Sequence, residues 1–232
     1  MAKKKGRSAN PNLCKSQFMD SIQTARNIIK CTEQFVSAGK PKEPHIPVTY
    51  MTKIVELAFL GVMAAWEEFL ENTMTRYLIG ARTKTGKGPK LKIGHAIALD
   101  EAIAIVGLNP EYDPKRHIIT WTSTTTIKAR AKFFFVGGEP YVTALENNEA
   151  LIQWAVAIRN RIAHKSKKCK AAFKDAALNF IKGPNLPSSY SPGKLLRSTA
   201  TKNFSKEINQ ADITVFEAFM KTFEGMAEKI VP

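Results

Sequence analysis

The amino-acid sequence predicts an all-α protein: a helical bundle of four long helices, with shorter helices inserted between them. Along most of the chain apolar residues recur at steps of three and four, which is the spacing of one helical face. Glycine and proline separate these periodic segments, as they do at the ends of helices. The 232 residues can bury a substantial core and show no internal repeat. We therefore expect a single domain over residues 13–232, preceded by a flexible basic arm at residues 1–12.

Two long helices open the predicted bundle. The first is expected over residues 15–38, with an apolar face that begins at Phe18 and with Gly39 after its last turn. The second is expected over residues 48–79 and has apolar side chains on more than one face, which favours a central position. Its first stripe is Met51, Val55, Ala58, Val62, Trp66 and Phe69, and its second is Phe59, Met63, Leu70 and Tyr77.

The middle of the chain is harder to interpret. Residues 80–94 are expected to form a basic, glycine-rich loop, and a short helix is expected over residues 95–106. Within residues 110–145, the stretch WTSTTTIKARAKFFFVGG fits either a strand followed by a turn or a threonine-capped helix that ends at Gly137. We favour the helix, starting at about residue 125.

Three helices complete the predicted bundle. One runs over residues 146–163 and another over residues 169–181, where a Gly-Pro pair follows. A polar loop at residues 184–204 then leads to the last helix, which Ser205 is expected to cap. The apolar residues at helical spacing in this last helix are Ile208, Val215, Phe219, Phe223, Met226 and Ile230.

The balance of charge indicates an anionic partner. Lysine and arginine number 35 and aspartate and glutamate 20, so the net charge is +15, more than solubility requires. RNA or another nucleic acid is the first expectation. No apolar segment follows the basic start of the chain, and the longest apolar stretch, residues 54–66, contains Glu56 and is too short to span a bilayer. We therefore expect a soluble, cytoplasmic protein without membrane association.

The stretch AIRNRIAHKSKK, residues 157–168, joins an apolar helix to a run of lysines. At about 100 degrees per residue, one side of this helix is apolar and forms the predicted core face. That side consists of Leu151, Trp154, Ala155, Ile158 and Ile162. Asn160 and His164 fall opposite it, one turn apart, near the small apolar residues Val156 and Ala157. A second apolar face suits packing against another helix, including one from a second subunit, so Asn160 and His164 are expected at an interface.

These residue types suit cleavage of RNA without a metal ion. A histidine side chain titrates near neutral pH, so His164 can move the proton when a ribose 2′-OH attacks its own phosphate. Arg159 stays cationic and can form forked hydrogen bonds to the charged phosphorane, while Asn160 can orient either group. From Ala150 to Lys174 the chain has seven basic residues and no acidic one. They are Arg159, Arg161, Lys165, Lys167, Lys168, Lys170 and Lys174, and we expect this surface to bind the phosphates of RNA.

The hexapeptide from Arg159 to His164 resembles the R-x4-6-H signature of the HEPN superfamily, including the polar residue that commonly follows the arginine. The order of helices is also similar, with a helix of the type AAWEEFLEN (residues 64–72) before the signature. The resemblance implies an HEPN-like domain and a homodimer in which two copies of the motif form a composite active site. It further implies a metal-independent endoribonuclease that leaves 2′,3′-cyclic phosphate and 5′-OH ends, with Arg159 and His164 catalytic and Asn160 supportive. Such enzymes act in toxin–antitoxin or antiphage systems, so an antitoxin or regulatory protein would be a further partner.

One geometrical difficulty accompanies this prediction. Arg159 lies about 140 degrees round the helix from His164, so one unbroken helix cannot easily aim both at one phosphate. Either the helix ends before His164, or the arginine wraps round, or a second chain supplies one of the pair. The charge also fits two other functions: a non-catalytic module that binds nucleic acid or a partner protein, and a nucleotide-binding accessory to a nucleotidyltransferase.

The second basic segment is the loop TKTGKGPK at residues 83–90. It lacks the G-x-x-x-x-G-K-[ST] pattern of a P-loop and follows a helix rather than a strand. Its Lys84 and Lys87, with Arg82 before them, are expected to contact RNA. The other three histidines and the three cysteines lack the spacing of metal ligands, so we expect no metal and no cofactor.

Overall fold

A computed structural model describes residues 10–36, 46–92, 94–96, 98–107, 119–181, 186–187, 189–200 and 212–232. Within these ranges the chain consists of α-helices, two short 3₁₀ turns and connecting segments, and no β-strand occurs. Two isolated β-bridges join Leu91 to Phe135 and Thr199 to Thr214. The all-α prediction is confirmed.

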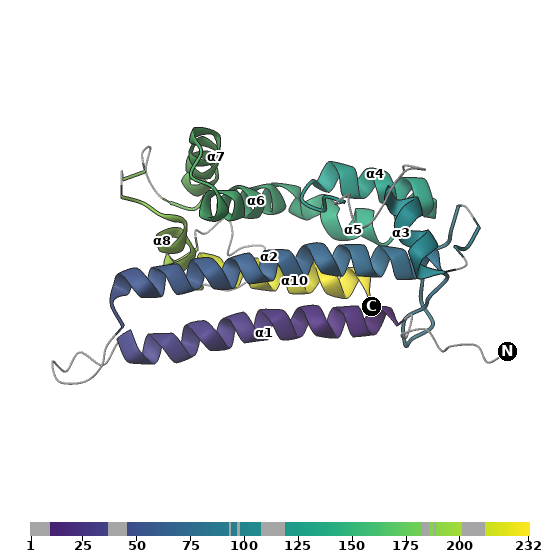
Figure 1. Cartoon of the computed structure of the whole chain (residues 1–232), viewed down its shortest axis with the longest axis horizontal. Helices are drawn as coiled ribbons and strands as arrows, with labels where there is room; N and C mark the ends of the chain where they lie inside the picture. Colours follow the sequence, from purple (N-terminus) through teal and green to yellow (C-terminus); the bar gives the residue numbers. More distant parts are fainter. Residues whose placement is uncertain are drawn as a thin grey trace. The chain divides into compact units, whose positions relative to one another are not determined.

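Figure 1 shows the helices in chain order. They are α1 (Pro11–Val36), α2 (Val48–Leu78), α3 (Leu99–Gly107), α4 (Thr124–Phe134), α5 (Tyr141–Leu145), α6 (Glu149–Ala163), α7 (Lys167–Leu178), α8 (Pro192–Arg197) and α10 (Val215–Ile230). The 3₁₀ turns η1 (Val136–Gly138) and η2 (Glu146–Asn148) lie on either side of α5 in the chain. Helices α1, α2, α6 and α10 are the longest of those described, and they correspond to the four long helices predicted.

The described chain forms two compact units, and each is considered by itself. The α4–α5 unit comprises the described parts of Met1–Phe18, Trp66–Glu149 and Gly225–Pro232. The α6–α7 unit comprises the described parts of Met19–Ala65 and Ala150–Glu224. Helices α1, α2 and α10 supply residues to both units. The single domain expected over residues 13–232 stays a prediction.

Aromatic side chains fill the core of the α4–α5 unit. Phe18 lies 5.5 Å from Trp66 and 5.2 Å from Phe69 between ring centroids, and the last two rings lie 5.6 Å apart. Trp121 is buried before α4, and its indole donates a 2.8 Å hydrogen bond to the Glu71 carboxylate. This tryptophan therefore anchors the segment that leads into α4.

Aromatic rings also form the core of the α6–α7 unit. Phe219 of α10 contacts Phe59 of α2 at 5.5 Å and Phe180 at 5.7 Å between centroids, in edge-to-face arrangements. Trp154 of α6 meets Phe180 at 5.2 Å. These contacts fix α6 to the core of its unit, and they thereby position the motif at its end.

The buried carboxylate of Glu56, on α2, holds the start of α8. It accepts a 3.0 Å hydrogen bond from the Gly193 amide and pairs with the Lys53 ammonium. A Cβ atom at residue 193 would lie 2.3 Å from the carbonyl oxygen of Thr52. Only glycine allows α8 to approach α2 this closely, so the acidic residue inside the apolar helix has a structural partner.

Two predicted segments can be compared with the structure directly. The polar loop expected at residues 184–204 is wrong in part, because it contains α8, which Ser191 caps and Pro192 begins. In the ambiguous stretch, the helix we favoured is confirmed and the strand is wrong. This helix, α4, begins at Thr124, and the Ser123 hydroxyl accepts a hydrogen bond from the Thr126 amide. It ends at Phe134 rather than Gly137, which instead belongs to η1.

The ends of the chain also differ from expectation. Helix α1 begins at Pro11, so residues 11 and 12 are helical and do not belong to the predicted arm. Proline can occupy the first turn of a helix because the amide it lacks would have no helical partner there. Residues 1–9 lie outside the described residues, and so does Ser205, the expected cap of the last helix. The last helix, α10, begins only at Val215, so the prediction of one continuous helix from Ser205 is wrong at residues 212–214, which are not helical. The Thr214 hydroxyl accepts a 3.2 Å hydrogen bond from the Glu217 amide, and Thr214 pairs with Thr199 in a β-bridge. The predicted apolar residues of α10 are buried from Val215 to Ile230.

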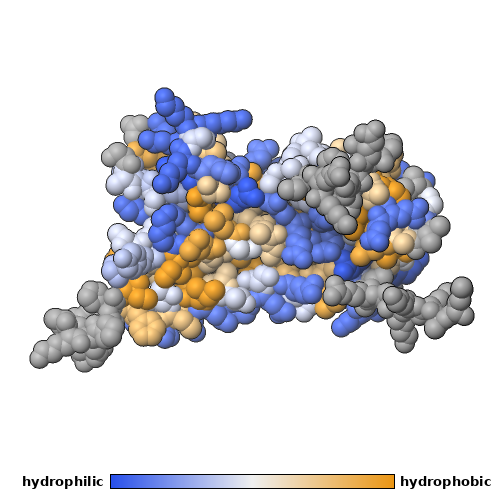
Figure 2. All heavy atoms as spheres, in the orientation of Figure 1, coloured by the Kyte–Doolittle hydropathy of each residue, from blue (hydrophilic) through white to orange (hydrophobic). Residues whose placement is uncertain are grey.

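Part of the α6–α7 unit exposes apolar side chains. Ile28 of α1 and Leu57 of α2 are 47% and 64% exposed, and both line a groove between the two helices. Figure 2 shows hydrophobic residues, in orange, in the left half of the view where α1 and α2 run. Among the described helices, α2 is long and apolar enough to cross a membrane, by criteria that core helices of water-soluble proteins also meet. The absence of membrane association stays a prediction.

Candidate nucleic-acid site at the end of helix α6

Helix α6 presents the motif by burying one of its sides. The buried residues are Leu151, Ile152, Ala155 and Ile158. Three of them belong to the predicted core face, and the other two residues predicted there, Trp154 and Ile162, are half-buried. The predicted orientation of the helix is therefore largely confirmed, with Asn160 half-buried and His164 exposed.

The end of α6 decides how the motif is displayed. The helix ends at Ala163, and His164 is the first residue beyond it. The His164 amide still donates a 2.8 Å hydrogen bond to the carbonyl of Asn160, which closes the last turn. Of the three geometries that the sequence leaves open, the structure has the first, in which the helix stops before the histidine.

Two hydrogen-bonded pairs organise the polar residues of this turn. Nη1 of Arg159 donates to Oδ1 of Asn160 at 3.0 Å. Nη1 of Arg161 donates to the carbonyl oxygen of His164 at 3.3 Å. The Arg161 guanidinium thus satisfies a carbonyl at the negative end of the helix, where a cation is favourable. The sequence did not lead us to expect this second contact.

Three residues separate the end of α6 from the start of α7. The hydroxyl of Ser166 accepts a 3.2 Å hydrogen bond from the Cys169 amide and caps the helix. Lys167, Lys170 and Lys174 recur at steps of three and four, so they share one side of α7. Lys168 lies on a different side, and all the lysines from Lys165 to Lys174 are exposed.

A pocket with a volume of about 480 Å³ is formed by the end of α6, by α7 and by the segment after it. We call it the cationic pocket. Its basic residues are Arg161, Lys167, Lys170 and Lys174, and its other lining residues are Ala171, Phe173, Leu186, Pro187 and Tyr190. No acidic residue lines it among those that the structure describes. Figure 2 shows hydrophilic residues, in blue, over α7 at the upper left.

The sequence pattern revealed the charge of this pocket but not its apolar side. Tyr190 and Pro187 lie in the segment that we interpreted as a polar loop, so no role was assigned to them. Lys174, the last basic residue of the acid-free run expected to bind phosphates, lines the pocket. The available signal was a tyrosine in a segment rich in proline and serine shortly after a basic helix, since such a residue can supply a stacking surface for a base.

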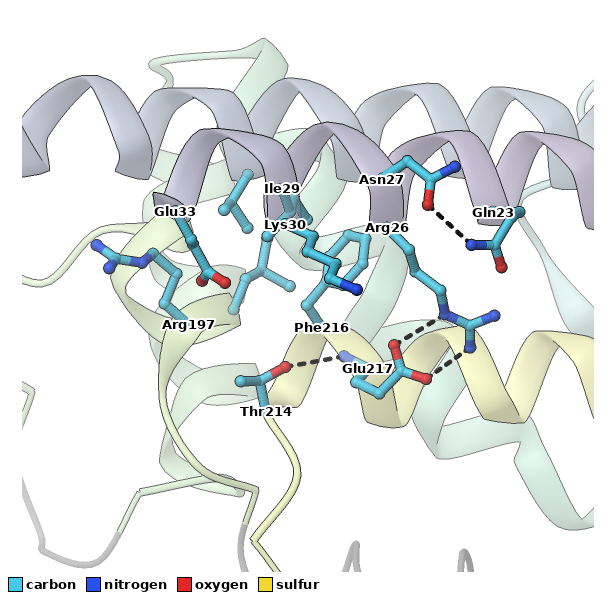
Figure 3. A pocket seen from close by; sticks show the side chains of 12 residues that line it. Gln23, Arg26, Asn27, Ile29, Lys30, Glu33, Arg197, Thr214, Phe216 and Glu217 are labelled. Atoms are coloured by element: carbon cyan, nitrogen blue, oxygen red, sulfur yellow. Dashed lines mark hydrogen bonds and ion pairs between the residues drawn. The ribbon is translucent and has the colours of Figure 1, made fainter. Parts of the chain in front are cut away.

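A second pocket in the same unit has a volume of about 450 Å³, and its lining includes an arginine that is paired with carboxylates. Figure 3 shows Arg26 of α1 reaching Glu217 of α10. Arg26 donates to both carboxylate oxygens of Glu217, at 2.9 and 2.6 Å, and it also pairs with Glu224. Partial burial lowers the pKa of Arg26, but the hydrogen bonds to Glu224 and Glu217 outweigh burial and raise it above its ordinary value. We call this the ion-paired pocket.

The basic loop that was expected to contact RNA belongs to the α4–α5 unit. Arg82, Lys84 and Lys87 are all exposed. The loop is closed by a 3.0 Å hydrogen bond from Nη1 of Arg82 to the carbonyl of Gly86, a glycine with a φ of 78°. Contact between these three residues and RNA stays a prediction.

No group of three or more histidine, cysteine, aspartate or glutamate residues that could hold a metal ion occurs in the part of the chain that the structure describes. The absence of a metal and of a cofactor stays an expectation. Comparisons with known proteins find no matching family model, no matching curated protein and no matching solved structure. The fold and the site therefore define an all-α protein with an acid-free cationic pocket beside an Arg-Asn…His turn.

Proposed function

We propose that the protein is a metal-independent endoribonuclease of HEPN type. The observation that carries this proposal is the C-terminal end of α6, which holds Arg159 and Asn160 and is followed directly by His164. Arg161, which donates to the His164 carbonyl, also lines the cationic pocket. His164 is exposed and lies beyond the helix end, so a phosphate can approach it from solvent. The neighbouring cations favour a polyanionic substrate.

In the proposed reaction, the 2′-oxygen of a ribose attacks the adjacent phosphorus, and the bond from that phosphorus to the 5′-oxygen of the next nucleotide breaks. His164 accepts the proton of the 2′-hydroxyl or donates a proton to the leaving 5′-oxygen. Arg159 binds the non-bridging oxygens as negative charge develops on them. Asn160, whose amide oxygen accepts from Arg159 at 3.0 Å, orients that guanidinium. The products carry a 2′,3′-cyclic phosphate and a 5′-OH.

We propose further that two copies of the chain form a composite active site, because the reaction needs both a base and an acid. Val156 and Ala157 are half-buried in the single chain, which leaves apolar surface on α6 for a partner helix. Mixed dimers of an Arg159→Ala chain and a His164→Ala chain should then recover partial activity, because the shared site still contains one intact Arg159 and one intact His164. A monomeric mass in solution would contradict this arrangement.

The decisive test is cleavage of RNA by the purified protein in the presence of a chelator. His164→Ala and Arg159→Ala should each lower the cleavage rate by about 100-fold or more. His95→Ala, which removes an exposed histidine of the α4–α5 unit, is the matched control and should leave the rate unchanged. Mass spectrometry should identify cyclic phosphate ends. If either motif variant cleaves at the wild-type rate, with its circular dichroism unchanged, the mechanism is wrong.

A non-catalytic module that binds nucleic acid or a partner protein is the second candidate. The cationic pocket favours it, since phosphate binding there needs no proton transfer. Steeply salt-dependent RNA binding without cleavage at any protein concentration would support this candidate. For the ribonuclease we propose a cytoplasmic role as a toxin or antiphage effector, with an antitoxin or regulatory protein that restrains it.

A further inference from the structure

The cationic pocket has two kinds of lining. Along α7 the exposed ammonium groups of Lys167, Lys170 and Lys174 follow one another about one helical turn apart, and all three line the pocket. The remainder is apolar or aromatic. Phe173 is buried, and the Tyr190 amide donates a 2.9 Å hydrogen bond to the carbonyl of Pro187, which closes the turn that brings Tyr190 to the pocket.

The basic residues of this pocket form no ion pair with a carboxylate in the part of the chain that the structure describes. Within the described chain, none of Arg161, Lys167, Lys170 and Lys174 pairs with a carboxylate, in contrast to Arg26, Lys53 and Lys128, which do. Four like charges around about 480 Å³ repel one another, and a bound anion relieves that repulsion. A pocket of this size suits a small ligand rather than a duplex.

Arg161 connects the pocket to the motif. Its guanidinium donates to the His164 carbonyl at 3.3 Å, and the same residue lines the pocket. A ligand whose anionic group contacts Arg161 therefore lies next to the turn that carries His164. This proximity relates the pocket to the proposed reaction.

From these three observations we infer that the cationic pocket binds one nucleoside phosphate, with its phosphate on Lys167, Lys170, Lys174 and Arg161 and its base stacked on Tyr190. The nucleotide is either part of single-stranded RNA or free in solution. Where it is part of RNA, the inference rests on the proposed function: the pocket then holds a nucleotide that flanks the scissile phosphate, and Tyr190 is a specificity-determining residue.

Calorimetric titration of the full-length His164→Ala protein tests the pocket without cleavage. The ligands are 5′-AMP, adenosine and inorganic phosphate, and 5′-AMP should bind at least about tenfold more tightly than either of the others, because it alone engages both kinds of lining. Tyr190→Ala should weaken 5′-AMP binding about tenfold, while Tyr190→Phe should preserve it. Lys170→Gln should weaken it about fivefold at about 0.1 M salt. Lys30→Gln, at an exposed lysine of the same unit outside the cationic pocket, should change it less than about twofold.

A competition experiment identifies the source of the nucleotide. A single-stranded RNA decamer that displaces 5′-AMP with an affinity at least about tenfold higher assigns the pocket to RNA, because further phosphates then contribute. A decamer that fails to displace 5′-AMP assigns the pocket to a free nucleotide. Either result supports the inference that the pocket binds a nucleoside phosphate.

Three results would overturn the inference. Phosphate could bind as tightly as 5′-AMP, Tyr190→Ala could bind 5′-AMP unchanged, or Lys30→Gln could weaken binding as much as Lys170→Gln. Any of these results would reduce the pocket to a patch of positive charge without a place for a base. Since the titration uses a protein without His164, its outcome does not depend on whether the wild-type chain cleaves RNA, and the two proposals can fail separately.

Discussion

The two pockets of the α6–α7 unit are similar in size and differ in how their charges are balanced. The ion-paired pocket has a volume of about 450 Å³, and its Arg26 is held by Glu217 and Glu224. The cationic pocket has a volume of about 480 Å³, and its four basic residues have no carboxylate partner in the described chain. Both contain arginine, and among the described residues Arg26 pairs with carboxylates whereas Arg161 does not.

This difference separates structural charge from charge that is available for binding. Where the fold neutralises a guanidinium, as at Arg26, an external anion would have to compete with two carboxylates already in place. Where no described carboxylate pairs with the cation, as at Lys170, we propose that an anion from solution supplies the opposite charge. The net charge of +15 alone does not distinguish these cases, because every lysine and arginine contributes to it equally.

The largest expected effect comes from removing the charge of the cationic pocket. Replacing Lys167, Lys170 and Lys174 together by glutamine should lower the affinity for single-stranded RNA on the order of 100-fold at about 0.1 M salt, because three phosphate contacts are lost. The slope of log affinity against log salt should decrease by about 2. Fluorescence anisotropy at several salt concentrations measures the affinity and the slope. An unchanged slope would contradict the claim that these lysines are available to bind phosphates. The free energy of unfolding should change by less than about 0.5 kcal/mol, because these residues are exposed.

For the ion-paired pocket we expect a loss of stability without a loss of RNA affinity. Arg26→Ala should lower the free energy of unfolding by about 1–3 kcal/mol, between the values for exposed and for buried pairs, because the three side chains are 23–29% exposed. RNA affinity should stay the same. Lys30→Ala, an exposed lysine one turn further along α1 that lines the same pocket, is the matched control. Urea unfolding measures the difference in the free energy of unfolding. Equal values for Arg26→Ala and Lys30→Ala would show that the ion pairs of Arg26 do not stabilise the fold.

Much of the fold could be predicted from local patterns. Both stripes of α2 are buried except for Ala58, which is half-buried, and the buried side of α6 is largely the predicted one, because periodicity reports burial directly. Helix α8 was missed because its position depends on Glu56, a residue 137 positions away from its partner Gly193. Gly193 is needed because the Thr52 backbone lies against it, but the sequence around Gly193 does not distinguish it from a glycine in a loop.

The same limit applies to the candidate site. The acid-free run around the motif is contiguous in sequence, so its charge could be recognised. The partners of Arg26 lie 191 and 198 residues away, so nothing near Arg26 distinguishes it from a lysine that is free to bind. Tyr190 joins the pocket through a turn that only the folded chain reveals. Local sequence therefore finds a cluster of charge, whereas long-range contacts decide which charges remain available.

Tyr141 adds a third case to the comparison, a titratable group that is fully buried with no cation beside it. Burial raises the pKa of Tyr141 well above its ordinary value, although its hydroxyl donates a 2.9 Å hydrogen bond to Thr73. The folded protein therefore retains the phenol proton at a pH where the unfolded chain has lost it. The resulting stability is complete below the unfolded pKa of about 10 and is lost as the pH rises above it.

At pH 11 this group alone should lower the free energy of unfolding by about 1.4 kcal/mol relative to pH 9. Tyr141→Phe should remove that contribution, so its stability should fall less steeply with pH than that of the wild type, which also has Tyr77 with a pKa raised by burial. Tyr50→Phe, at a tyrosine that is 64% exposed, should leave the slope unchanged. Urea unfolding at pH 9, 10 and 11 measures the three slopes. Parallel curves for the wild type and Tyr141→Phe would mean that the phenolate of Tyr141 is accommodated in the fold. In that case burial without a counter-charge would not keep the Tyr141 phenol neutral in the folded protein at this pH.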